Sequence, residues 1–441
     1  MESALRRQLD TLADLGLEPS EAFLVAAKRI GAYQEALKVI DRLETADSAS
    51  PRADPAPPAQ PPPAPPPQPS SRRSIIAVEQ SAATDEFMTM GILACGAGMA
   101  SRAPALFGMS FEYQGDFYGR NLSLLVLPFL AGYFAWSHGL SARWTVRLAA
   151  VFAASAAIIN LYPFDGDESG DTLLLAALHL PVLMWLAVGA AHCGGDWRNH
   201  KKRLDFVRFT GEWGIYYGMI AIGGTVLTGL AAAVFTIIGA DVVELIGFWI
   251  TPAAAAGSVV VAGWLADTRK GVLERLAPVL TRLFTPMFTV LMLSFLAAAI
   301  ISGGGIEASR TLLIIFDVLL LVVAALVLYS VAARDPQAGP NIFDVAQTAL
   351  VIAALLADLF VLSAMVDRLS EFGATPNRFA ALGINLVLLV NLAGAAWLYV
   401  GFLRGRVSFE RLERWQADYA NVYAVWLAVV IVVLPPVFGF A

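Results

Sequence analysis

The sequence predicts an all-α polytopic membrane protein: a bundle of about eleven transmembrane helices behind a small N-terminal helical prefix. Two observations predict this fold class. The mean hydropathy of the 441-residue chain is +0.64, and charged residues make up only 15% of it, well below the roughly 25% usual in soluble domains. The apolar residues also fall in runs of about 20, the length that a helix needs to cross a bilayer core.

Residues 1–45 are expected to form a short cytoplasmic helical prefix. Leu5, Leu9 and Leu12 recur at helical spacing, and Gly16 follows them as a stop signal. Such a short unit buries little core alone. Two interpretations therefore stay open: a marginal helical hairpin, or a docking element for a partner protein or for the membrane domain itself.

Residues 46–85 form a proline-rich linker in this interpretation. The prolines between Pro55 and Pro69 favour extended polyproline II and prevent a packed core. The linker is therefore expected to be a semi-rigid spacer between the prefix and a transmembrane domain that covers residues 86–441.

From Glu86 onward the chain contains eleven apolar runs that predict membrane spans. The first run is the weakest, because it contains Arg102 and Pro104. The predicted spans are 86–107, 118–137, 146–164, 172–192, 213–238, 243–265, 286–303, 310–333, 343–366, 378–403 and 418–439.

Basic residues gather in alternate loops, as in the fourth loop with Lys201, Lys202 and Arg203, whereas the loops between them are often acidic. The positive-inside rule then places the N-terminus in the cytoplasm and the C-terminus outside, in the inner (plasma) membrane of a cell. Two basic stretches, 201–210 and 271–284, are also amphipathic. They are expected to lie on the inner membrane surface before the chain turns into a span.

Several function classes lack the residues that they need. The net charge is −6 and there is no basic domain, so no nucleic-acid partner is predicted. Cys95 and Cys193 fit neither a disulfide framework nor a zinc site, and with four histidines no metal site and no cofactor are predicted. The chain contains no zinc-protease histidine motif, nucleophile elbow or dinucleotide fingerprint, so an enzyme is disfavoured.

Five polar residues inside apolar runs form a predicted layer in the outer third of the membrane. From the roughly 1.5 Å rise per helical residue, Asp317, Asp358 and Asn385 lie about 10–12 Å below the outer surface. His179 and Asn160 fall at a similar level. Two of the five are carboxylates on neighbouring spans.

The layer has two interpretations. Carboxylates beside amides and an imidazole suit an ion or substrate site, with Asp317 and Asp358 pointing inward within reach of each other. Alternatively, each polar group satisfies its neighbours across a helix interface, at roughly 0.6 to 2 kcal/mol each. The two carboxylates favour the site more than the single amides do, because an ionised carboxylate costs about 2.5 to 3.5 kcal/mol at a helix centre in the membrane.

The loop between the ninth and tenth spans is predicted to be a structural hairpin or an outer gate. Gly373 is placed to end one helix and Thr375 to cap the next. Arg368 and Glu371 are three residues apart and can pair.

Arg378 lies on a side of the membrane where few basic residues are found. Either it pairs with Asp367 or Glu371 and fixes the hairpin, or it guards the entrance to the polar layer.

Two segments resemble known families. Residues 368–378, RLSEFGATPNR, resemble a recurring segment of large bacterial membrane proteins in the families called domain of unknown function 4153 and 4173. Residues 16–31, GLEPSEAFLVAAKRIG, resemble the permease-prefix segment that precedes such membrane domains. The resemblance implies a permease-like context and assigns no substrate or catalytic residue. The chain departs from the pattern at Ala374, where a larger apolar residue is common, and in its long linker.

The sequence favours a transporter or permease-like protein that handles protons or cations at Asp317 and Asp358, with the lipid bilayer as its surroundings. The alternative is a membrane sensor or accessory subunit that signals through residues 1–45 to a protein partner. An intramembrane enzyme acting on lipid-linked substrates ranks last, with only loop carboxylates such as Asp165, Asp167 and Glu168 to offer. The oligomeric state is not predicted.

Overall fold

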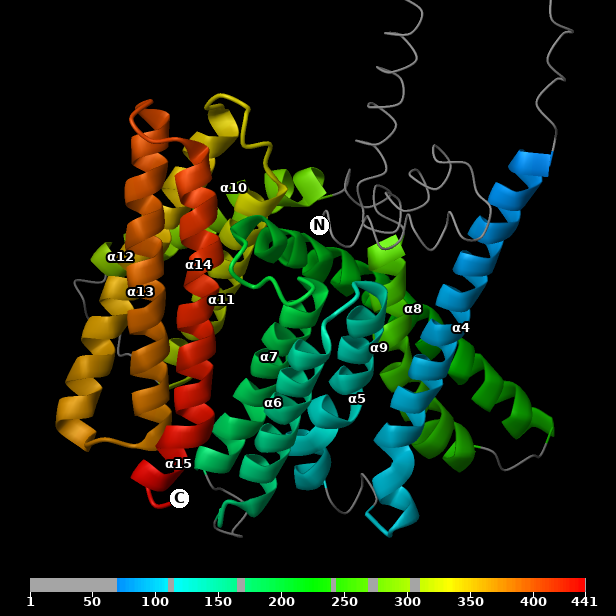
Figure 1. Ribbon diagram of the computed structural model, residues 1–441. Helices are drawn as coiled ribbons and strands as arrows, with labels where there is room; N and C mark the ends of the chain where they lie inside the picture. Colours follow the sequence, from blue (N-terminus) through cyan, green and yellow to red (C-terminus); the bar gives the residue numbers. More distant parts are fainter. Residues whose placement is uncertain are drawn as a thin grey trace, which may run out of the picture. The chain divides into compact units, whose positions relative to one another are not determined.

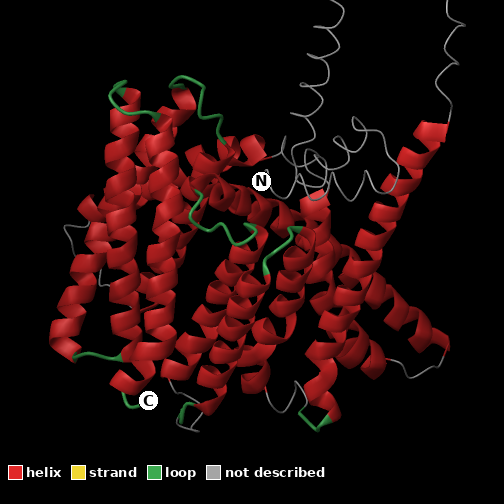
Figure 2. Cartoon of the chain, viewed as in Figure 1, coloured by secondary structure: helices red, strands yellow, loops and turns green. Residues whose placement is uncertain are grey.

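The computed structural model describes residues 70–109, 115–164, 171–238, 243–268, 277–301 and 310–440. The chain divides into two compact units, Met1–Met88 and Thr89–Ala441. The described residues form helices joined by short turns and contain no β-strand (Figures 1 and 2), which confirms the predicted all-α class. The predicted prefix, residues 1–45, lies outside the described residues.

Most helices of the second unit run up and down in succession, whereas α8 runs obliquely to them (Figure 1); such a succession is expected for a chain that crosses a bilayer repeatedly. Two helical segments are π-helices, labelled η. The elements are α4 Ser70–Leu106, α5 Gly115–Ser137, α6 Ala142–Leu161, α7 Asp171–His192, α8 His200–Ile238, η1 Leu245–Ile250, α9 Thr251–Thr268, α10 Ala277–Ile301, α11 Arg310–Ala333, α12 Ile342–Phe372, α13 Pro376–Leu403, α14 Phe409–Ala428, η2 Val429–Val433 and α15 Leu434–Val437.

Eight helices in the described ranges are long and apolar enough to cross a membrane, counting η1 with α9 and the segments of α14 to α15 as one each. α10 contributes a shorter apolar helix, Thr281–Ala297. α4 and α5 coincide with the first two predicted spans, but Arg102, Asp116 and Arg120 lower their apolar content. The chain is therefore a multi-pass membrane protein, and the count of eleven spans stays a prediction.

Some segment boundaries differ from the sequence prediction. α4 begins at Ser70, directly after Pro69, so the last part of the predicted linker is helical. This stretch contains no proline until Pro104, and nothing in it forbids a helix. α8 runs without a break from His200 to Ile238, so residues 201–210 continue into the span and do not turn before it. In the other amphipathic stretch, residues 271–276 lie outside the described residues, and α10 begins at Ala277.

Two large hydrophobic clusters form the core of the unit Thr89–Ala441. The first centres on α5, α7 and α9, where Leu130, Leu180 and Val260 are fully buried. The second lies among α10 to α14 and includes Leu320 and Leu388. Figure 1 shows the corresponding two groups of helices side by side.

The first turns of α8 connect the two clusters. Phe206 belongs to the first cluster, whereas Leu204 packs against Ala332 at the end of α11. Arg203, which is buried, forms an ion pair with Asp418 on α14. These contacts hold one face of residues 201–210 against both clusters, while Lys201, Lys202 and Asp205 are exposed. The expected position of this stretch at the membrane surface stays a prediction.

Both π-helices precede prolines. η1 is followed by Pro252, and η2 by Pro435 and Pro436. Proline has no N–H, and its ring clashes with the carbonyl one turn earlier. The wider π turn changes the bonding pattern there: the N–H of Thr251 donates to Ile246, five residues back.

Glycines allow α13 to approach the indole rings of α14. A Cβ atom added at Gly383 would lie 1.9 Å from Cη2 of Trp426, and one added at Gly394 would lie 2.2 Å from Cζ2 of Trp415. A rigid indole cannot yield to such an overlap without moving the helix. The spacing of α13 and α14 therefore depends on these glycines.

We expect Gly383→Ala to destabilise the protein by about 1–3 kcal/mol, the usual cost of overpacking a core. Unfolding in detergent, followed by heating or by denaturant titration, measures this change. Gly132→Ala on α5 is the matched control, because a Cβ atom there meets nothing within 4 Å. Equal effects of the two substitutions would contradict the proposed contact.

Candidate functional site

α12 and α13 form an antiparallel hairpin with a short turn (Figure 1). α12 ends where Gly373 adopts a φ of +75°, and its N–H donates to the carbonyl of Leu369. α13 begins with the Thr375 hydroxyl accepting the N–H of Arg378 at 3.4 Å, and Pro376 occupies the first helical position. Gly373 and Thr375 thus act as caps of the hairpin.

Arg378 holds the end of α12 through backbone carbonyls. Its Nη1 donates to the carbonyl oxygens of Phe372 and Gly373, both at 2.8 Å. The predicted pairing of Arg378 with Asp367 or Glu371 is therefore wrong. The last carbonyls of a helix lack intrahelical donors and carry partial negative charge, so they attract a cation.

The ring of Phe372 lies near two guanidinium groups. Their central carbons are 5.5 Å from the ring centre for Arg378 and 6.0 Å for Arg368. Glu371 is exposed. Both arginines therefore make cation–π contacts with the ring, and Asp367 and Glu371 in the same segment balance their charge.

Asp358 is fully buried in the middle of α12. Neither of its carboxyl oxygens accepts a hydrogen bond from any residue that the structure describes. Asp317 on α11 is close enough to act on it electrostatically, and the charge of Asp358 acts in turn on Tyr423 of α14. Buried polar groups are normally paired, so the empty acceptors of Asp358 need a proton or a ligand.

Asn385 on α13 joins the two carboxylate helices. Its Nδ2 donates to Oδ1 of Asp317 at 2.8 Å and to the carbonyl of Ala381 at 2.9 Å, and it lies 3.5 Å from Sδ of Met365 on α12. Asn385 is fully buried, and its Oδ1 has no hydrogen-bond donor among the described residues. Asp317, Asp358 and Asn385 therefore form one polar cluster, which we call the carboxylate cluster.

The carboxylate cluster lies between two apolar layers. On one side, Phe316 and Val361 pack together with Met365. On the other side, Leu320 and Leu388 belong to the large second hydrophobic cluster. Within apolar surroundings of this kind, electrostatic interactions are strong and unpaired charge is costly.

The other two predicted site residues make their hydrogen bonds elsewhere. Asn160 on α6 exchanges two hydrogen bonds with Asn121 on α5, at 2.7 and 3.0 Å. His179 on α7 contacts the carbonyl of Leu175 in its own helix at 2.7 Å. Three of the five predicted residues thus come together, while Asn160 joins α6 to α5.

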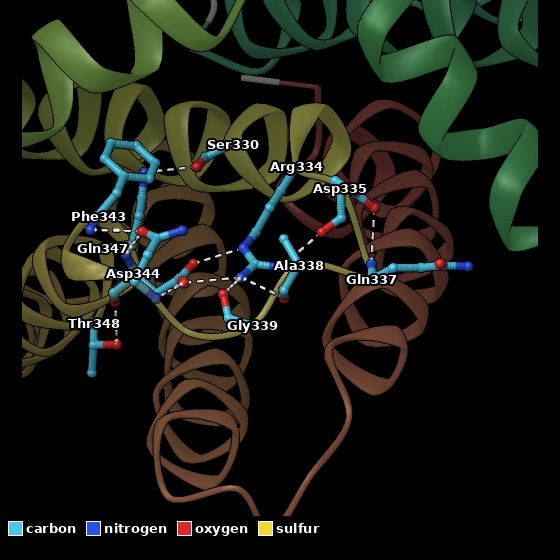
Figure 3. A network of polar contacts seen from close by, with 11 residues as sticks. Ser330, Arg334, Asp335, Gln337, Ala338, Gly339, Phe343, Asp344, Gln347 and Thr348 are labelled. Carbon is cyan, nitrogen blue, oxygen red and sulfur yellow. Dashed lines mark hydrogen bonds and ion pairs between the residues drawn. The ribbon is translucent and has the colours of Figure 1, made fainter.

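A buried ion pair lies at the N-terminal end of α12, opposite the hairpin turn (Figure 3). Nε of Arg334 donates to Oδ1 of Asp344 at 2.8 Å, and Nη2 donates to Oδ2 at 2.9 Å. Asp344 is 1% exposed and also accepts the N–H of Asn341 in a capping box. The guanidinium carbon of Arg334 lies 4.9 and 4.3 Å from the ring centres of Phe402 and Phe409. The pair therefore fastens the turn before α12 to the turn after α13.

Further polar bonds link the helices between this ion pair and the carboxylate cluster. Gln347 Nε2 donates to the hydroxyls of Thr285 on α10 and Ser330 on α11, at 2.7 and 2.8 Å (Figure 3 shows the bond to Ser330). Asn391 and Gln416 exchange two longer hydrogen bonds between α13 and α14, at 3.3 and 3.4 Å. Sequence inspection missed the Arg334–Asp344 pair, although the Asn341-to-Asp344 spacing is a readable helix-start signal.

Removing Arg334 is expected to leave Asp344 buried without its partner. Arg334→Gln should therefore cost about 3–5 kcal/mol of stability, the usual price of breaking a buried pair from one side. In the double variant Arg334→Gln with Asp344→Asn, part of this loss should be recovered, because no charge remains buried. Chemical denaturation in mixed micelles gives both values.

The exposed pair of Arg414 and Glu410 provides the control. Their side chains are 58% and 50% exposed, and surface ion pairs contribute little. Arg414→Gln should leave the stability unchanged. If Arg334→Gln behaved like Arg414→Gln, the structural role of the buried pair would be disproved.

No protein-family model matches the chain, and neither a curated protein nor a solved structure matches it. The resemblance of residues 16–31 and 368–378 to the permease-prefix and unknown-function families stays a prediction. The function is therefore inferred from the residues of the site itself.

Proposed function

We propose that this membrane protein is a permease-like transporter of the inner membrane in which Asp358, with Asp317 and Asn385, handles protons or cations. The observation that supports it is the carboxyl group of Asp358, fully buried in a long apolar helix with no hydrogen-bond donor among the described residues. An intramembrane carboxylate of this kind is a functional-site candidate by default.

The chemistry of the proposal follows from the cost of buried charge. An ionised carboxylate costs about 2.5–3.5 kcal/mol at the centre of a membrane helix, and no described hydrogen bond offsets that cost at Asp358. Asp358 therefore either carries a proton or is neutralised by a cation. Asp317 and Asn385 supply further oxygen atoms, which are the ligands that hard cations take.

Replacing Asp358 by asparagine removes the exchangeable charge while keeping the shape of the side chain. In proteoliposomes with a pH-sensitive dye inside, we expect proton flux driven by a Na⁺ or K⁺ gradient to fall at least about tenfold in Asp358→Asn. Asp317→Asn should reduce flux as well. Asp335→Asn, at an exposed residue of the turn before α12, is the control and should leave flux unchanged.

The stability of Asp358→Asn distinguishes a transport role of Asp358 from a role in helix packing alone. Asp358 accepts no described hydrogen bond, so Asp358→Asn should be at least as stable as the wild type. If the group served only to join helices, the variant would lose stability and keep its flux. That combination would contradict the proposal.

The proposal also includes the orientation, with the N-terminus in the cytoplasm and the C-terminus outside. Ala374 in the hairpin turn and Arg406 in the turn before α14 are both exposed, and the helix α13 separates them. In a chain lacking the free cysteines Cys95 and Cys193, a membrane-impermeant maleimide added outside intact cells should label Ala374→Cys and spare Arg406→Cys. The reverse labelling would refute the orientation.

The alternative function, a sensor or accessory subunit that signals through residues 1–45, stays a prediction, because that prefix lies outside the described residues.

A further inference from the structure

A cavity of about 680 Å³ lies between α4, α5, α7, α8 and α9, apart from the carboxylate cluster. This volume falls within the roughly 300–1,000 Å³ of small-molecule sites. Leu122 and Val182 line the cavity and are 44% and 51% exposed. Because both are apolar residues on the surface of a membrane domain, the cavity opens toward the hydrocarbon of the bilayer.

Arg102 on α4 brings a charge to this cavity. The residue is only 7% exposed and lines the cavity wall. Its Nε–H is buried and donates to no acceptor, and no carboxylate of a described residue pairs with the guanidinium. Its aromatic neighbour is Trp249, whose ring centre is 5.2 Å from the guanidinium carbon. Buried charges are normally paired, so Arg102 lacks an anion.

Two indole N–H groups of the wall already have partners, whereas the buried Oγ of Ser123 has none among the described residues. Nε1 of Trp213 donates to the carbonyl of Val259, and Nε1 of Trp185 donates to the hydroxyl of Thr210, both at 3.1 Å. The aromatic bodies of Trp185 and Trp213, with apolar residues such as Val126, form the remaining wall. A ligand of this cavity therefore needs one acidic group and an apolar body.

We propose that the cavity binds an anionic amphiphile, with its phosphate or carboxylate head on the guanidinium of Arg102 and its hydrocarbon chain along the aromatic wall. Guanidinium groups match the two oxygens of such a head with paired N–H donors. The lateral opening at Leu122 and Val182 lets the molecule enter from the bilayer. This inference does not depend on the proposed transport function.

Native mass spectrometry of the full chain in a neutral detergent tests the proposal. The probes are dioleoyl phosphatidylglycerol, dioleoyl phosphatidylcholine, oleate and inorganic phosphate, each titrated separately. We expect phosphatidylglycerol or oleate to bind at least about tenfold tighter than phosphatidylcholine, since one charge-assisted hydrogen-bonded contact distinguishes them. Which of the two binds tighter identifies a phosphate or a carboxylate head.

Arg102→Gln should reduce binding of the anionic amphiphile at least about tenfold and bring it to the level of phosphatidylcholine. Arg143→Gln is the matched control, because Arg143 is an exposed arginine on α6 outside the cavity lining. Leu122→Trp, at the exposed mouth, should weaken binding while leaving Arg102 in place. It keeps the test decisive if Arg102→Gln does not fold.

Three results would overturn the proposal. Equal binding of phosphatidylglycerol, oleate and phosphatidylcholine would show that Arg102 does not recognise a charged head. Binding of the anionic amphiphile that survives both Arg102→Gln and Leu122→Trp would place it elsewhere on the protein. Inorganic phosphate that binds as tightly as the amphiphiles would show that the hydrocarbon chain is not needed.

Discussion

Every polar group inside a membrane domain has to find its partner within the protein, because hydrocarbon offers none. This constraint explains most of the polar contacts between the helices. Asn121 pairs with Asn160, Asn391 pairs with Gln416, and Arg334 is enclosed with Asp344. Each of these contacts joins two helices, or two turns, at a defined height and rotation.

Asp358 and Arg102 are buried charged residues without such a partner among the described residues, and other buried atoms, such as Oδ1 of Asn385, lack one too. Asp358 has two oxygens without hydrogen-bond donors, and Arg102 has a buried Nε–H without an acceptor in the described part of the chain. They carry opposite charges and belong to different groups of helices, Asp358 among α10 to α14 and Arg102 beside α5, α7 and α9. Burying an unpaired charge or polar group costs folding free energy, so each of the two is a candidate functional group. One suits a proton or cation, and the other an acidic head group.

The two groups of helices are not independent. The start of α8 places Phe206 in one cluster and Leu204 on the end of α11, and Arg203 pairs with Asp418 on α14. A ligand in the cavity would touch α8 through Trp213, on the same helix as these contacts. α8 therefore contacts the wall of the cavity as well as both groups of helices.

Much of the fold follows from apolar run length alone. The predicted span 310–333 coincides with α11, and the pair Asn341 and Asp344 is a helix-start signal in the sequence. The position of a residue within an apolar run also predicts its depth along the helix, and on that basis the sequence places Asp317, Asp358 and Asn385 at one level. The sequence does not predict the rotation of each helix about its axis, which decides the direction of its side chains. For that reason depth alone groups Asn160 with Asp317 and Asp358, although it bonds to Asn121.

In the first span, residues that weaken the apolar pattern have roles in tertiary packing. Its glycines and Arg102 weaken the apolar pattern, yet Gly98 lets α4 approach α9, where an added Cβ atom would lie 2.9 Å from the carbonyl oxygen of Ala253. Arg102 faces a cavity formed by five separate helices, an arrangement that no local pattern encodes. These features depend on contacts between distant segments, which composition and periodicity do not describe.

The proposed function requires that the carboxyl group of Asp358 exchange a proton or a cation. Infrared difference spectroscopy of the protein in lipid, between two pH values and with or without Na⁺ or K⁺, observes carboxyl groups directly. We expect a carboxyl signal in the wild type that responds to one of these changes and is absent in Asp358→Asn. Identical difference spectra for the wild type and the variant would contradict it.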